Sequence, residues 1–381
     1  MSPIPPTLAD RLYALRRQRG WSQRKLAARA QISNATVSRI ESGTGHGVSL
    51  TIVTMLADAL GCEVSALLLG GPPTRQAIDD LAHRVYRSLL PLTAPHRAAA
   101  PYPQLAADLA ALRTARVACD FVQVLAVAPP VLRALSVQDR PDDTTHACYD
   151  VALALRMLGH LSTAFIALNI AQQAADLAVA TAALSPVVTA LRGIFAIEDE
   201  EPATALALVE HARPAPVDGP AAAAGHATLA IVEGLTHAHT RRSDGSDQVH
   251  RARRLLARSD GTADLLGTGI FRPSDLDLWH MKIAVARRDF HGARALAGTP
   301  PPEPFTALLW QLNMCTVSLR LNEVDQAAGA LLAARDLAPQ LLPGRPETAG
   351  SADTLLTKRL KPRVLLQLRA IREDASAFAA R

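Results

Sequence analysis

Cysteine and aromatic residues are both scarce in this 381-residue chain. The four cysteines are Cys62, Cys119, Cys148 and Cys315, and their wide spacing with no C-x-x-C pair favours free thiols in a reducing compartment. Aromatic residues make up 4% of the chain and apolar residues 49%. This composition favours closely packed helices over a β-sandwich, whose strands require β-branched and aromatic side chains.

Long apolar runs and targeting patterns are also missing. The most apolar early stretch, residues 161–171, is too short to span a bilayer and is followed by polar residues. The first ten residues, MSPIPPTLAD, lack the basic and apolar segments of a signal peptide. We therefore expect a soluble, cytoplasmic protein with no membrane partner.

The usual sequence patterns of enzymes and metal sites do not occur. There is no H-E-x-x-H, G-x-S-x-G, Walker or G-x-G-x-x-G pattern. His237 and His239 are two residues apart on an expected helix, so their side chains point in different directions and cannot chelate one metal. The sequence thus predicts no catalytic residue, no metal and no cofactor.

Positive charge is concentrated near the N-terminus. Residues 1–71 hold eight Lys or Arg against four Asp or Glu, whereas the remaining residues hold 32 and 31. Such an imbalance indicates a polyanionic partner for the first fifth of the chain.

Two short helical patterns flank a three-residue break in SQRKLAARAQISNATVSRIESG, residues 22–43. Ser22 and Ser33 stand at N-cap positions, so we expect helices over 23–30 and 34–42. A preceding helix is expected from Thr7, which resembles a capping box with Asp10, to about residue 19, where Gly20 ends it. A fourth helix capped by Ser49 should end at Leu60, and EVSALLL (63–69) should form a fifth.

The helix expected over 34–42 has two different faces. Val37 and Ile40 should point inward together with Ile32. The opposite face is short, polar and amide-bearing, with one arginine, and consists of Asn34, Ala35, Ser38 and Arg39. Such a face suits base edges in the major groove, where Asn pairs with adenine and Arg with guanine.

Residues 7–69 resemble the Xre/lambda-repressor-type helix-turn-helix domain, because the string above is followed by VSLTIVTMLADALGCEVSALLL. The resemblance implies double-stranded DNA as a partner, with Gln23 contacting phosphate and an Arg16–Glu41 pair holding the first helix against the third. It also implies that Ser33, Asn34, Ala35 and Arg39 read bases, with Thr36 and Ser38 nearer the backbone. The alternative is a domain of this fold that serves only as a protein contact.

The chain departs from the family pattern at two places. Gln31 occupies a turn position where the family usually has glycine, so a non-glycine residue must accept a left-handed conformation. The loop TGHGV (44–48) is one residue longer than usual and lacks the common proline.

The rest of the chain predicts helices throughout. Residues 71–103 should form a linker with one helix, 76–90, and residues 104–381 a helical domain. A small–large–small pattern recurs behind short turns, with first alanines at 164, 205, 252, 293 and 327. This region resembles a degenerate tetratricopeptide-like superhelix, and an ordinary α-helical bundle is the alternative.

A superhelix of this kind presents a concave groove lined by the first helix of each pair. The candidate ligand residues on those helices are Trp279, Trp310, Asn313 and Arg320. A helix-turn-helix head before a tetratricopeptide-like body resembles the RRNPP group of peptide-sensing regulators, and the Ala- and Arg-rich composition suggests a high-GC bacterium. We expect an all-α transcriptional regulator that binds DNA as a homodimer, with a peptide or small molecule as a possible effector. The alternative is a helical-repeat scaffold for a partner protein.

Overall fold

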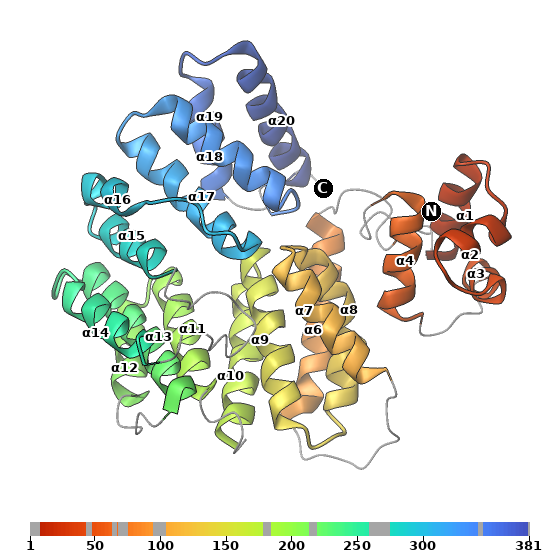
Figure 1. Ribbon diagram of the computed structural model, residues 1–381, viewed down its shortest axis with the longest axis horizontal. Coiled ribbons are helices and arrows are strands. Elements are labelled where there is room, and N and C mark those ends of the chain that lie inside the picture. The colour runs from red at the N-terminus through yellow and green to blue at the C-terminus, as the bar shows by residue number, and fades with distance from the viewer. Residues whose placement is uncertain are drawn as a thin grey trace.

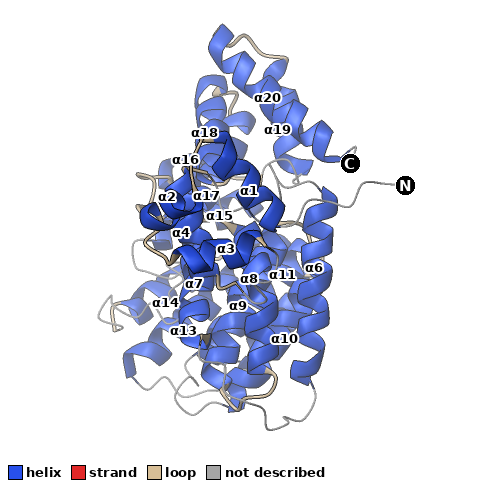
Figure 2. Ribbon diagram, turned by 90° about the vertical axis from the view of Figure 1, so that its right-hand side faces the viewer, coloured by secondary structure: helices blue, strands red, loops and turns tan. Residues whose placement is uncertain are grey.

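The computed structural model describes residues 8–42, 48–62, 67, 75–93, 104–177, 184–212, 219–258, 275–341 and 346–379. Every regular element among these residues is a helix (Figure 2), which confirms the all-α expectation. None of the described helices is long and apolar enough to cross a membrane.

The N-terminal head contains α1 (Leu8–Gln18), α2 (Gln23–Arg29), α3 (Asn34–Glu41) and α4 (Leu50–Leu60). Ser22 and Ser33 cap α2 and α3 as predicted. The hydroxyl of each serine accepts a hydrogen bond from the backbone N–H three residues later, that of Lys25 at 3.1 Å and that of Thr36 at 3.0 Å. Ser49 holds the N-cap position of α4 but makes no side-chain cap bond, contrary to expectation. The predicted fifth helix, apart from Leu67, lies outside the described residues, as do Thr7 and residues 43–47.

One small core holds the four helices of the head together. Leu12, Leu26, Val37 and Leu56, one from each helix, are fully buried. The packing of these buried side chains against one another holds α3 in its position in the head. The head contacts the rest of the described chain through α4 and α7 (Leu105–Val117).

The helix that the sequence assigned to a linker packs on the body instead. It is α6 (Arg75–Leu89), followed by the 3₁₀ turn η1 (Leu90–Thr93). Ile78, Leu81, Val85 and Leu89 are at most 1% exposed, and α6 contacts α8 (Phe121–Leu135) and α10 (Leu161–Leu177). Its apolar face is consequently covered within the same chain and is not open to a second copy.

The body is an array of antiparallel helix pairs (Figure 1). The remaining helices are α9 (Pro141–Met157), α11 (Ser185–Glu198), α12 (Pro202–Ala212), α13 (Gly219–Thr240), α14 (Ser246–Leu256), α15 (Leu276–Ala286), α16 (Phe290–Leu296), α17 (Pro304–Arg320), α18 (Val324–Leu337), α19 (Pro346–Leu356) and α20 (Pro362–Ala379). The pairs run from α7/α8 to α19/α20, and from α11 to α19 each first helix also contacts the next first helix.

The recurring small residues lie on the second helix of successive pairs, where the pattern placed them. Ala164, Ala205, Ala252, Ala293 and Ala327 are all completely buried. A side chain this small lets the paired helices approach closely, so the sequence repeat records the packing of the array.

The turns within six of the pairs, from α7/α8 to α17/α18, share one conformation. Each of these six has a residue with positive φ one or two positions after the first helix: Cys119, Gly159, Glu200, Arg241, Arg288 and Asn322. The following N–H then bonds to the carbonyl five residues earlier, as in the bond of 2.8 Å from Asp120 to Ala115 and that of 2.8 Å from Glu323 to Ser318. Five of these six residues are not glycine, so the array accepts backbone strain at five turns.

The pair α17/α18 contacts the first pair of the array. Phe305 at the start of α17 meets Phe121 edge-to-face, with ring centroids 6.0 Å apart, and both rings are buried. The Gln340 amide donates a hydrogen bond to the Cys119 carbonyl in the turn between α7 and α8. The helix α7 therefore contacts α17 of the array as well as α4 of the head.

Candidate nucleic-acid interface

The outward face of α3 is exposed as the sequence predicted. Asn34, Ala35, Ser38 and Arg39 are exposed, whereas Val37 and Ile40 are buried. Four different side-chain groups thus reach solvent from one short helix: an amide, a methyl group, a hydroxyl and a guanidinium. These groups match the donor and acceptor patterns of base edges in a major groove.

The first turn of α3 is fixed by two hydroxyl groups. The Ser33 hydroxyl accepts from the Thr36 N–H and lies 2.8 Å from the Thr36 hydroxyl. Ser33 is exposed and Thr36 half-buried. Because the Ser33 and Thr36 hydroxyls are engaged with each other, Asn34, Ala35 and Arg39 are the better-placed candidates for reading bases.

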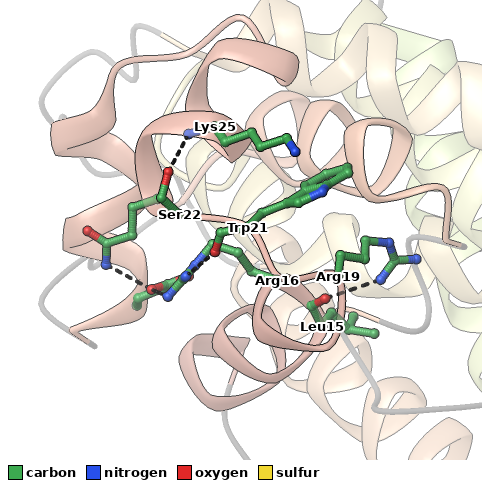
Figure 3. A network of polar contacts seen from close by, with 8 residues as sticks. Leu15, Arg16, Arg19, Trp21, Ser22 and Lys25 are labelled. Carbon is green, nitrogen blue, oxygen red and sulfur yellow. Dashed lines mark hydrogen bonds and ion pairs between the residues drawn. The ribbon is translucent and has the colours of Figure 1, made fainter.

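A buried ion pair holds α3 against α1. Arg16 Nε lies 2.6 Å from Glu41 Oε1, and Arg16 Nη2 donates to Glu41 Oε2 at 2.7 Å. The third donor, Nη1, reaches the Trp21 carbonyl at 2.7 Å (Figure 3). Arg16 is 5% exposed, so it is a structural residue, as the resemblance implied, and not a DNA contact.

Gln23 is tied to the same carboxylate. Its Nε2 donates to Glu41 Oε2 at 2.8 Å, and its side chain is half-buried at the start of α2. An amide NH₂ carries two donor hydrogens, so one remains for the phosphate contact predicted for Gln23. The sequence did not predict the bond to Glu41, which fixes the direction of the Gln23 amide.

The ionic state of this cluster follows from its contacts. The hydrogen bond to Glu41 outweighs burial and raises the pKa of Arg16 above its ordinary value. Burial alone raises the pKa of Glu41, but the hydrogen bonds from Arg16 and Gln23 and the charge of Arg16 outweigh it and lower that pKa. Both groups therefore stay charged at neutral pH.

The turn between α2 and α3 has the strained conformation that the sequence predicted. Gln31 has φ of +53°, in the left-handed region where glycine is usual. The next N–H, that of Ile32, bonds to the Ala27 carbonyl at 3.0 Å and closes the end of α2. A non-glycine residue thus forms this turn at a conformational cost.

A cation–aromatic stack covers the outer side of α2, and the sequence interpretation missed it. Lys25 Nζ and Arg29 Cζ lie 5.5 and 4.6 Å from the centroid of the Trp21 ring. The spacing of four residues between Trp21, Lys25 and Arg29 was the available signal, since it places the three on one helical face. Lys25 and Arg29 thus place two positive charges together on α2.

Two of the predicted ligand residues, Trp279 and Trp310, make contacts within the array. Trp279 is 2% exposed, and the Lys282 ammonium lies 4.8 Å from its ring centroid, so this tryptophan packs in the core. Trp310 is half-buried and donates to the Ala297 carbonyl at 2.6 Å, which joins α17 to the end of the preceding pair.

The other two candidates on α17 make contacts within the array. The Asn313 amide donates to the Leu309 carbonyl of its own helix at 2.8 Å. The exposed Arg320 guanidinium lies 5.8 Å from the Phe290 ring centroid. A shallow depression of about 420 Å³ lies elsewhere, between the end of α2 and α4, and is lined by Arg29, Ala30, Gln31, Met55, Asp58 and Ala59.

Metal binding finds no support in the described part of the chain, where no group of three or more His, Cys, Asp or Glu side chains is arranged to hold an ion. Cys119 and Cys148 form no disulfide, and burial raises the pKa of each to about 12. These two thiols are therefore protonated at neutral pH.

A comparison with known families agrees with the geometry of the head. Residues 12–67 match the helix-turn-helix family model. The matched segment contains α2, α3 and α4 and most of α1, so the chain carries a helix-turn-helix domain whose exposed helix is α3. This supports a DNA-binding regulator in general terms. No curated protein matches the sequence.

Proposed function

We propose that this protein is a sequence-specific transcriptional regulator that reads operator DNA with α3. The observation that carries the proposal is the exposed polar face of α3, held rigidly by the buried Arg16–Glu41 pair. Asn34 and Arg39 read base edges in the major groove, and Ser38 contacts the backbone nearby. Gln23, oriented by Glu41, donates its second amide hydrogen to a phosphate.

The regulator binds a partly palindromic operator as a homodimer. One α3 covers only half of such a site, and two heads must lie about 34–36 Å apart to meet successive major-groove faces. Support for this step comes from the size of the head, which presents one recognition helix per chain. The protein works in the cytoplasm, where its DNA is found.

The helical array carries the sensing and assembly functions. Its pairs of antiparallel helices agree with the resemblance to tetratricopeptide-like, RRNPP-type regulators. The contact of α7 with both α4 and α17 gives a ligand bound in the array a physical route to the head. The effector is a peptide or small molecule, and the chain acts as a regulator rather than an enzyme.

A titration separates this function from that of a scaffold. Affinity is measured by fluorescence anisotropy at several salt concentrations, on random duplex and on the duplex upstream of the protein's own gene. A regulator of this class shows a specificity ratio of about 10³ or more between an operator and random DNA. Equal affinities for the upstream duplex and for random duplex would favour a scaffold that binds a partner protein.

A further inference from the structure

Three successive turns of the array place charged residues in equivalent positions. Glu200, Arg241 and Arg288 follow α11, α13 and α15, with φ of +60°, +56° and +63°. Each turn is closed by the same backbone bond, Glu201 to Ala196 at 2.8 Å, Arg242 to His237 at 3.0 Å and Asp289 to Ala284 at 3.0 Å. Since the three turns have one geometry, their side chains project from fixed points.

The three turns lie on one edge of the array. A Cβ on Gly193 of α11 would lie 2.9 Å from the Val232 side chain of α13. A Cβ on Gly234 of α13 would likewise lie 3.1 Å from Ile283, near the end of α15. Because α13 contacts both α11 and α15, the three first helices are neighbours, and repetition of the helix pair places their equivalent turns on one edge of the array. Asp244 and Arg287, 4.0 Å apart, join the second turn to the third.

Charge alternates along this edge. The first turn presents the exposed acidic residues Asp199, Glu200 and Glu201. The second presents the exposed basic residues Arg241 and Arg242, while its Asp244 is paired with Arg287 of the third turn, which also carries Arg288. Packed helices lie about 8–10 Å apart, which sets the separation of neighbouring turns. Among the described residues no ion pair joins the acidic turn to Arg241 or Arg242.

We propose that this edge is the surface on which two copies of the chain meet, the acidic turn of each copy facing the basic turn of the other. A two-fold axis between the first and second turns brings 199–201 of one copy onto 241–242 of its partner, and the reverse contact follows by symmetry. The inference deepens the proposed function, because it names the contact that holds two heads on one operator.

The same observations disfavour a nucleic acid on this edge. The carboxylates of the first turn stand beside the arginines and repel a phosphate backbone. A second copy meets both signs of charge with the opposite sign, so it fits the pattern where a polyanion does not. Such complementarity fixes the orientation of the two copies.

Charge reversal and its repair test the proposal in the full-length chain. The acid-reversed variant is Asp199→Lys/Glu200→Lys, and the base-reversed variant is Arg241→Glu/Arg242→Glu. Each variant places like charges opposite one another twice in the dimer, so its dimer Kd, measured by sedimentation without DNA, should rise about ten-fold or more. Raising the salt concentration should weaken the wild-type dimer, since the Debye length falls from about 10 Å at 0.1 M to 3 Å at 1 M.

The decisive variant carries all four substitutions. In this variant the first turn is basic and the second is acidic, so each turn again faces the opposite charge on the partner copy. Its dimer Kd should therefore return to within about three-fold of the wild-type value. An equimolar mixture of the two reversed variants should form heterodimers for the same reason. Because all four side chains are exposed, each variant should fold as the wild type does. Thermal melts followed by circular dichroism check this.

Controls separate the possible failures. Arg84→Glu/Arg87→Glu, an equal charge change at exposed positions of α6, should leave the dimer unchanged. The proposal is overturned if the wild-type chain is a monomer, if either reversed variant dimerises as the wild type does, or if the variant with all four substitutions stays monomeric. Loss of DNA affinity in the base-reversed variant with an unchanged dimer would instead assign these arginines to DNA. Arg39→Ala should keep the dimer mass, so failure of the reader and failure of the edge are distinguishable.

Discussion

The carboxylate of Glu41 organises the head at the scale of single residues. It accepts hydrogen bonds from Arg16 on α1 and Gln23 on α2 while standing at the end of α3. Three helices are thereby joined at one buried ionic centre. The removal of one partner from such a centre leaves a charge without compensation, which costs far more than an exposed ion pair contributes.

Acidification should loosen α3 by protonating Glu41. Its pKa is lowered in the folded protein, so the stabilisation is fully present above the unfolded value of about 4.3 and is lost as the pH falls through the folded pKa. Hydrogen exchange of the α3 amides should show the wild type more protected than Glu41→Gln at pH 7. The difference should shrink below about pH 4. A difference that did not change with pH would show that Glu41 acts by shape alone.

Arg39 tests base reading at the same scale. Arg39→Ala should cost about 1–3 kcal/mol at one base position and relax the preference there, because a bidentate contact to guanine is lost. Arg29→Ala is the matched control, since Arg29 lies over Trp21 on α2. Binding to a set of singly substituted operators gives both values. If the two variants behaved alike, the proposed docking of α3 would be incorrect.

The turns are the informative features at the scale of elements. Five of the turns within pairs use a non-glycine residue at positive φ, at a cost of roughly 1–2 kcal/mol each. Arg288→Gly should therefore stabilise the array by about 1 kcal/mol, after allowance for the extra freedom of glycine in the unfolded chain. Arg287→Gly, at a helix end with φ of −78°, should be neutral or destabilising. Urea unfolding compares the two, and an equal effect would show that the turn is not strained.

Local signals determined how much of these elements could be predicted. Ser22 and Ser33 act through the next three residues, so their caps are readable from sequence, and the spacing of Val37 and Ile40 defines the inner face of α3. The partner of α6 was not readable, because an amphipathic face does not say what covers it. For the same reason the burial of Trp279 and the bond from Gln23 to Glu41 emerge only from the packed helices.

The whole molecule joins one DNA-reading head to a long array. A fragment of residues 1–71 should be monomeric and should bind operator far more weakly than the full chain, because it carries one recognition helix and no array surface. Sedimentation of both species, free and on operator duplex, measures this. A full-length chain that is monomeric in both states would contradict dimeric binding.

The central claim is that α3 reads a defined DNA sequence. Its most direct test is the selection of bound fragments from the source genome with the full-length protein and with an Asn34→Ala/Arg39→Ala variant. We predict that the wild type enriches fragments sharing a partly palindromic motif, with half-site centres one helical turn or a multiple of it apart, and that the variant loses that motif. Enrichment without a shared motif, or the same motif with the variant, would contradict the account.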